Sequence, residues 1–94
     1  MHDDVDEDIK RLAHVLERDL YELYKTPMLS GENLQMALGF SSIDAYRRAL
    51  TRKKLPIPVF KLENRRGTYA LTKDVAAWLA TQAVNAKRKN MKSK

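Results

Sequence analysis

The stretch SGENLQMALGFSSIDAYRRALTR, from Ser30 to Arg52, predicts two short helices joined at a hinge. Its first serine can cap a helix, and the apolar run that follows ends at Gly39, a residue type that commonly closes helices in the left-handed conformation. Ser41 and Asp44 then have the spacing of a capping box, so a second helix should begin at Ile43 and run to the end of the stretch. Helix, glycine turn and capped helix is the order of a helix-turn-helix motif.

The predicted second helix has an apolar side and a charged side. The apolar residues recur at helical spacing and suit burial: Ile43, Tyr46, Ala49 and Leu50. The charged side carries Asp44, Arg47, Arg48, Thr51 and Arg52, with Lys54 shortly after. Guanidinium groups arranged in this way can bind guanine edges or phosphates. A solvated flank of an ordinary helical domain has the same pattern, so the helix alone leaves both interpretations open.

The charge of the chain is unevenly distributed. The 94 residues carry a net charge of +6, but residues 1 to 24 hold eight acids and three bases, a net charge of −5. The remaining seventy residues therefore carry +11. A basic region behind an acidic one suggests a polyanionic partner that meets one side of the protein.

The sequence argues against an enzyme, a metalloprotein and a membrane protein. The length suits one domain with a small core and little room for a deep cleft. The chain has no cysteine, and His2 and His14 have no companions suited to a metal site. We expect no catalytic residues, cofactor or small-molecule ligand, since no carboxylate pair, nucleophile motif or phosphate-binding loop is present. The acidic N-terminus and the lack of a membrane-length apolar run favour a cytoplasmic location.

Residues 5 to 24 predict a five-turn amphipathic helix, which Pro27 prevents from continuing. Its apolar positions step by three or four residues: Val5, Ile9, Leu12, Leu16, Leu20 and Leu23. This stripe either covers the core of its own chain or pairs with its twin in a homodimer. Its negative charge should in either case direct the helix away from a DNA duplex.

The second half of the chain predicts a hairpin followed by a helix. Two prolines at 56 and 58 forbid helix, residues 59–62 and 68–71 predict two strands, and the turn between them carries Arg65 and Arg66. Thr72 can cap the next helix. The apolar stripe of that helix is Val75, Trp78, Leu79 and Ala83. Beyond Val84 the basic sequence should fray into a tail.

Three segments, LGFSSIDAYRRAL, LPIPVFKL and NRRGTYALTKDVAAWLATQ, resemble in this order the AlpA-type phage regulators and related excisionases, small winged-helix proteins of the wider MerR-like group. Pyocin-activator-like regulators are also similar. The resemblance lies within residues 34 to 82 and implies that the second helix enters the major groove, with the hairpin as a wing on the adjacent minor groove or backbone. Carried over by position, it implicates Ser41, Ser42, Asp44, Arg47, Arg48 and Arg52 on the helix, and Arg65 and Arg66 on the wing.

The sequence therefore predicts an α+β fold that is mainly α, a winged helix-turn-helix with a two-stranded hairpin wing and an extra long N-terminal amphipathic helix. The expected division is residues 1–27 for that helix and its linker, 28–85 for the DNA-binding domain and 86–94 for a basic flexible tail. The expected function is sequence-specific binding of double-stranded DNA in a prophage or other mobile element, as a transcriptional regulator or an excisionase. The alternative is a protein-interaction module that uses the N-terminal helix and binds nucleic acid only nonspecifically.

Overall fold

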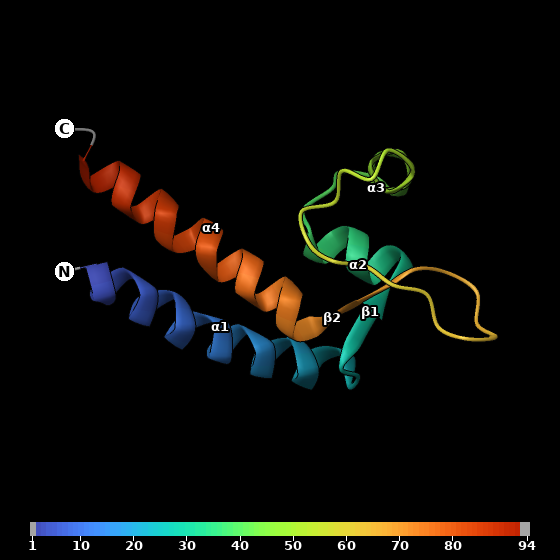
Figure 1. Cartoon of the computed structure of the whole chain (residues 1–94), viewed down its shortest axis with the longest axis horizontal. Coiled ribbons are helices and arrows are strands. Elements are labelled where there is room, and N and C mark those ends of the chain that lie inside the picture. The colour runs from blue at the N-terminus through green and yellow to red at the C-terminus, as the bar shows by residue number, and fades with distance from the viewer. Residues whose placement is uncertain (1, 93–94) are drawn as a thin grey trace.

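The computed structural model describes residues 2–92, which form two long helices and a smaller head (Figure 1). α1 (His2–Tyr24) and α4 (Thr72–Lys92) run antiparallel along each other, and we call them the helix pair. The head, residues 28–71, sits where α1 ends and α4 begins, and it contains α2 (Gly31–Ala37), α3 (Ile43–Thr51) and a two-stranded antiparallel sheet. The fold is thus α+β and mainly α, as predicted.

The helix pair gives the molecule an elongated shape. Its extents are 48 × 25 × 20 Å, and both ends of the described chain lie at the far end of the helix pair from the head (Figure 1). Within residues 2–92, no helix is long and apolar enough to cross a membrane.

The sheet joins two segments that lie far apart in the sequence. β1 (Met28–Ser30) pairs antiparallel with β2 (Tyr69–Leu71), so that Leu29 lies opposite Ala70. Both side chains are buried, with exposures of 2% and 0%, so this sheet belongs to the core. The sequence did not indicate a strand at residues 28–30.

The predicted two-stranded hairpin of residues 59–62 and 68–71 is wrong, because the two segments do not pair along their length. The first segment contributes a single bridge, in which the main chains of Phe60 and Tyr69 bond each other at 2.9 and 2.8 Å. β2 pairs instead with β1, because β1 supplies the buried Leu29 whereas residues 59 and 61 are exposed. The prolines at 56 and 58 also remove two main-chain donors from the approach to the bridge.

The core lies where the head meets the helix pair. Its buried side chains come from both strands, three helices and the connection after α3: Leu29, Leu34, Leu38, Tyr46, Ile57, Ala70 and Val75. Leu20 and Tyr24 of α1 pack against its edge. Burying one large apolar side chain such as Leu34 contributes about 1.5–3 kcal/mol, so these contacts hold the head on the helix pair.

The apolar stripe of α1 packs within its own chain. It lies along α4, where Ala76 and Ala80 are fully buried and their small side chains allow close approach. Leu12 and Leu16 remain half-buried, and Leu23 at the end of the stripe is 69% exposed. α1 therefore covers its own core, the first of the two alternatives, while part of its apolar surface still faces outward.

α4 differs from its prediction in length and in buried face. The residues beyond Val84, for which the sequence predicts fraying, are helical to Lys92. Val84 is buried in the helix pair. The alanine, lysines and arginine that follow it are good helix formers, and the positive charges of the lysines and the arginine suit a helix C-terminus. Ala83, expected on the buried stripe, is exposed, since the helix turns Ala80 and Val84 inward instead. Residues 93–94 of the predicted tail lie outside the described residues.

Thr72 ties the start of α4 to the end of the first linker. Its N–H and its hydroxyl both donate to the carbonyl of Pro27, at 2.8 and 3.1 Å. Thr72 was expected to cap α4 with its hydroxyl, but that group is used in this contact across 45 residues because the side chain is 97% buried beside β1.

α3 ends in a tight turn that sends the chain back along the head. The N–H of Lys53 donates to the Leu50 carbonyl at 3.0 Å, and that of Lys54 donates to the Ala49 carbonyl at 2.8 Å. This pair of bonds is a Schellman motif, with Lys53 in the left-handed conformation at a φ of 57°. Glycine usually takes this position, because a side chain there costs about 1–2 kcal/mol.

Replacing Lys53 with glycine should therefore stabilise the protein. Lys53→Gly and Lys53→Ala remove the same charge, but only the glycine variant relieves the left-handed strain. In urea titrations we expect the unfolding free energy of Lys53→Gly to exceed that of Lys53→Ala by about 1 kcal/mol. Equal unfolding free energies for the two variants would contradict a strained turn at this position.

Candidate nucleic-acid interface

The hinge between α2 and α3 is fixed by hydrogen bonds around Gly39. Gly39, at a φ of 83°, donates its N–H to the Met36 carbonyl, and the N–H of Phe40 donates to the Gln35 carbonyl, both at 3.1 Å. This is a second Schellman motif, and it closes α2 at the predicted glycine. The side-chain amide of Gln35 also donates to the Phe40 carbonyl at 2.7 Å. Gln35 thus bonds both main-chain groups of Phe40 and sets the direction in which the chain leaves α2.

Aromatic packing carries that direction into α3. The edge of the Phe40 ring meets the ring of Tyr46 with centroids 6.0 Å apart and an interplanar angle of 67°. Tyr46 is 4% exposed, and this burial raises the pKa of its phenol. The other apolar positions predicted for α3 are half-buried: Ile43, Ala49 and Leu50. The predicted buried side of α3 is confirmed.

The cap of α3 differs from the prediction by one residue. α3 begins at Ile43 as expected, but the hydroxyl that accepts the N–H of Ala45, at 3.1 Å, belongs to Ser42. The capping box between Ser41 and Asp44 does not form, because the extended residue directly before the helix is Ser42. Ser41 is left exposed.

The predicted side-chain cap of α2 also does not form. Ser30 occupies the N-cap position, with φ at −154° and ψ at 170°, but its hydroxyl makes no capping hydrogen bond. The residue is the last of β1, so the sheet rather than a side-chain cap orients the start of α2.

Every residue predicted to contact DNA is exposed. They are Ser41, Ser42, Asp44, Arg47, Arg48, Thr51, Arg52, Lys54, Arg65 and Arg66. Four of them line one shallow hollow of about 210 Å³ on α3, and we call this set the basic face: Arg47, Arg48, Thr51 and Arg52. Among the side chains of residues 5–89, the ion pairs are Asp8–Arg11 and Glu22–Lys25, so none of the three arginines is held by an acid. Their donors are available to an external anion.

A second group of bases lies on the loop that follows. The tip loop, residues 60–69, is closed by the Phe60–Tyr69 bridge, whose rings stack with centroids 6.3 Å apart. The Tyr69 hydroxyl donates to the Arg66 carbonyl at 3.1 Å. As predicted, the turn uses left-handed residues, with φ at 62° for Asn64 and 93° for Gly67. The loop therefore holds its two exposed arginines at a defined tip without a strand ladder.

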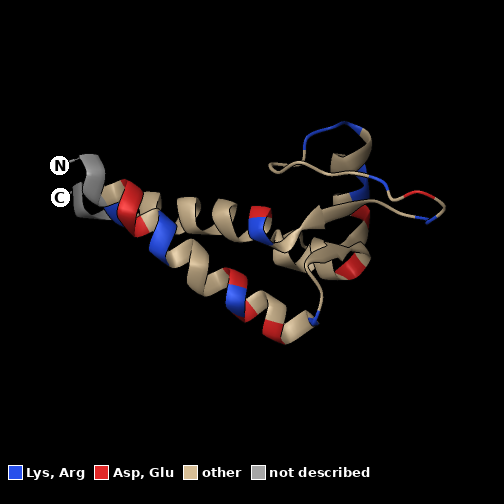
Figure 2. Cartoon of the chain, turned by 60° about the horizontal axis from the view of Figure 1, so that its bottom comes forward, with Lys and Arg blue, Asp and Glu red and all other residues tan. Residues whose placement is uncertain are grey.

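The connection between α3 and the tip loop is packed onto the head. Ile57 is buried, and a hollow of about 140 Å³ separates the connection from the end of α3, with Leu50 and Val59 among its lining residues. Lys53 and Lys61 are exposed near the predicted residues, and their charge alone could have marked them from the sequence. Figure 2 shows these basic segments on the head, while the acids of α1 lie along the helix pair.

Comparisons with protein-family models, with curated proteins and with solved structures find no significant match to this chain. The case for a function therefore rests on the residues and their arrangement.

The hinge gives a prediction about Gln35, which the sequence did not single out. Gln35→Leu keeps the size of the side chain but removes the donor to the Phe40 carbonyl, so we expect a loss of about 1 kcal/mol in unfolding free energy. Asn33→Leu, an exposed position on the same helix, is the matched control and should change stability by less than about 0.5 kcal/mol. Equal losses from the two changes in a urea titration would show that the Gln35 amide does not hold the hinge.

Proposed function

We propose that this chain is a sequence-specific double-stranded DNA-binding protein, built as a winged helix-turn-helix and without catalytic activity. In this proposal α2 and α3 are the helix-turn-helix, α3 is the recognition helix and the tip loop is the wing. The observation that carries the proposal is the basic face: three exposed arginines, none paired with an acid among residues 5–89, gather on α3 and its C-cap, and the core and the hinge fix the direction of that helix.

The chemistry of the basic face fits base reading in the major groove. Arginine can donate two hydrogen bonds to the O6 and N7 atoms of guanine, and each such pair discriminates against a wrong base by about 1–3 kcal/mol. Arg47 and Arg48 lie nearer the N-terminus of α3 than Arg52, and recognition helices contact base edges mainly through their N-terminal residues. Ser41 and Ser42 are exposed just before the helix, and their hydroxyls suit contacts to the flanking phosphates.

The tip loop fits a positioning role beside the recognition helix. Arg65 and Arg66 are exposed at a turn that two left-handed residues fix, and their charges suit phosphates or a neighbouring minor groove. Lys54, in the turn after α3, adds a further phosphate contact. Contacts of this kind hold a protein in register on the duplex but carry little sequence information.

The biological setting that we propose comes from the resemblance to AlpA-type regulators and excisionases. A protein of this kind acts within a prophage or another mobile element, in the cytoplasm, either as a regulator of transcription or as a directionality factor in recombination. Both roles use the same DNA-binding surface, so the residues that carry binding are the same in each.

The proposal separates residues that read bases from residues that position the protein. Binding is measured to a duplex that the wild type selects from a random pool and to a random duplex. Arg47→Ala or Arg48→Ala should reduce the free-energy difference between the two duplexes by about 1–3 kcal/mol. Arg65→Ala and Arg66→Ala should weaken binding to both duplexes by similar factors, because they contact the backbone.

Two results would contradict parts of this proposal. If all four variants weaken both duplexes identically, α3 is not the recognition helix. If the wild type ignores random duplex DNA and heparin at moderate salt, the basic face is only solvated, and the chain is an interaction module that uses α1.

A further inference from the structure

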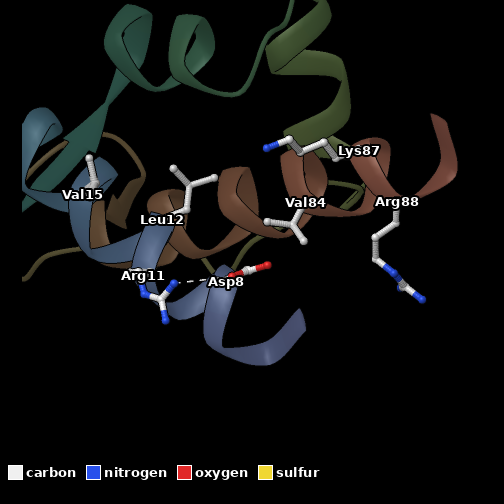
Figure 3. A pocket seen from close by; sticks show the side chains of 7 residues that line it. All are labelled: Asp8, Arg11, Leu12, Val15, Val84, Lys87 and Arg88. Carbon is white, nitrogen blue, oxygen red and sulfur yellow. Dashed lines mark ion pairs between the residues drawn. The ribbon is translucent and has the colours of Figure 1, made fainter. Parts of the chain in front are cut away.

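A groove runs between the two helices of the helix pair. It has a volume of about 510 Å³, and its apolar lining residues are Leu12, Val15 and Val84 (Figure 3). Asp8 and Arg11 line it from α1 and pair with each other at 3.6 Å. Lys87 and Arg88 line it from α4. None of the lining residues comes from the head, so the head does not cover this groove.

The flank of α1 that lines the groove at Val15 carries uncovered apolar surface, which continues past the groove to Leu23. Val15 is 50% exposed and Leu23 is 69% exposed. Leu12, Val15, Asp19 and Leu23 step by three, four and four residues, so they form one flank of α1. A two-helix layer covers an apolar stripe from one direction only, so Val15 and Leu23 on this flank stay exposed although Leu12 is half-buried.

Acidic and basic residues flank the apolar positions in matching order. On α1 the flank reads Asp8, Leu12, Val15, Asp19, which is acidic, apolar, apolar, acidic, with Arg11 beside Asp8 at its edge. On α4, the corresponding flank consists of Lys73, Ala77, Val84 and Arg88, which are separated by four, seven and four residues. Its order is basic, apolar, apolar, basic. Because the helices are antiparallel, Asp8 and Arg88 lie at the same level of the pair, and both line the groove. Asp19 and Lys73 both lie toward the head.

We propose that a second copy of this chain packs on the groove side of the helix pair, about a two-fold axis parallel to the helices. Two helix pairs can stack face to face about a two-fold axis in two ways. With the axis across the helices, α1 lies on its own copy in reverse, so acids meet acids and bases meet bases. With the axis along the helices, each α1 lies on the partner copy's α4, so Asp8 meets Arg88 at one end and Asp19 lies within about one helical turn of Lys73 at the other, a distance that the long lysine side chain spans.

The parallel arrangement also buries the uncovered apolar flank. Leu12 and Val15 of one copy fall against the α4 flank of the other, where Val84 lines the groove at 9% exposure and Ala77 is exposed, forming an apolar centre with charges at the rim, the usual anatomy of a protein interface. Rim charges contribute little affinity but penalise the reversed arrangement. Both heads then project from the same end of a four-helix bundle. This inference does not rest on the proposed function, because it uses only the helix pair.

The first test compares two equally exposed residues on opposite flanks of α1. Val15 and Tyr21 are each 50% exposed, but Tyr21 lines a different hollow beside Pro27 and Thr72. Sedimentation of the full chain without DNA should show a dimer of the wild type that dissociates on dilution. Val15→Lys should raise the dimer dissociation constant at least about tenfold, and Tyr21→Lys should leave it unchanged. Circular dichroism checks that both variants fold.

The second test exchanges charges to find out which residues of the two copies face each other. Asp19→Lys and Lys73→Asp should each weaken self-association, because like charges then meet at both rims. An equimolar mixture of the two variants should recover the wild-type association, since each lysine at 19 meets an aspartate at 73. A wild type that stays monomeric at millimolar concentration, equal effects of Val15→Lys and Tyr21→Lys, or a mixture that does not recover would each overturn the proposal.

Discussion

The contact between Thr72 and Pro27 closes the base of the head. One carbonyl oxygen accepts both the N–H and the hydroxyl of Thr72, and a buried hydroxyl requires such a partner. The contact brings the end of the first linker to the start of α4, which in turn places β1 beside β2 and α1 along α4. Residues 28–71 therefore form a closed unit whose two ends meet at one point. The arrangement of the head and the helix pair depends on this closure.

The closure also explains how a seven-residue helix and a nine-residue helix can present a defined surface. Isolated helices of this length are marginal in water, so α2 and α3 depend on tertiary contacts. The Gln35 bonds fix the hinge, and Tyr46 anchors α3 in a core that β1, β2 and α4 complete. The arginines of the basic face then need no structural role of their own. In our proposal that freedom is what makes them available to DNA.

Local signals in the sequence predicted the elements whose ends are set by their own residues. Gly39 marked the close of α2, the step of three and four marked α1, and the turn at Asn64 and Gly67 was correct. The β1–β2 pairing was missed because three-residue strands about forty residues apart carry no local pattern, and burial decided it. The extension of α4 was not predicted because it depends on contact with α1. The role of Gln35 was not predicted because it depends on a hydrogen bond from its side chain to the main chain of Phe40. The exposure of the candidate DNA contacts followed from periodicity, but their gathering around one hollow needed the fold.

The central claim, that α3 and the tip loop form the DNA-binding surface, can be tested by following backbone amide chemical shifts during titration with a selected duplex. We expect the largest shift changes at residues 41–54 and 64–67, with much smaller changes along the groove side of α1 and α4. Largest changes along the helix pair, with α3 unaffected, would contradict this account of the protein.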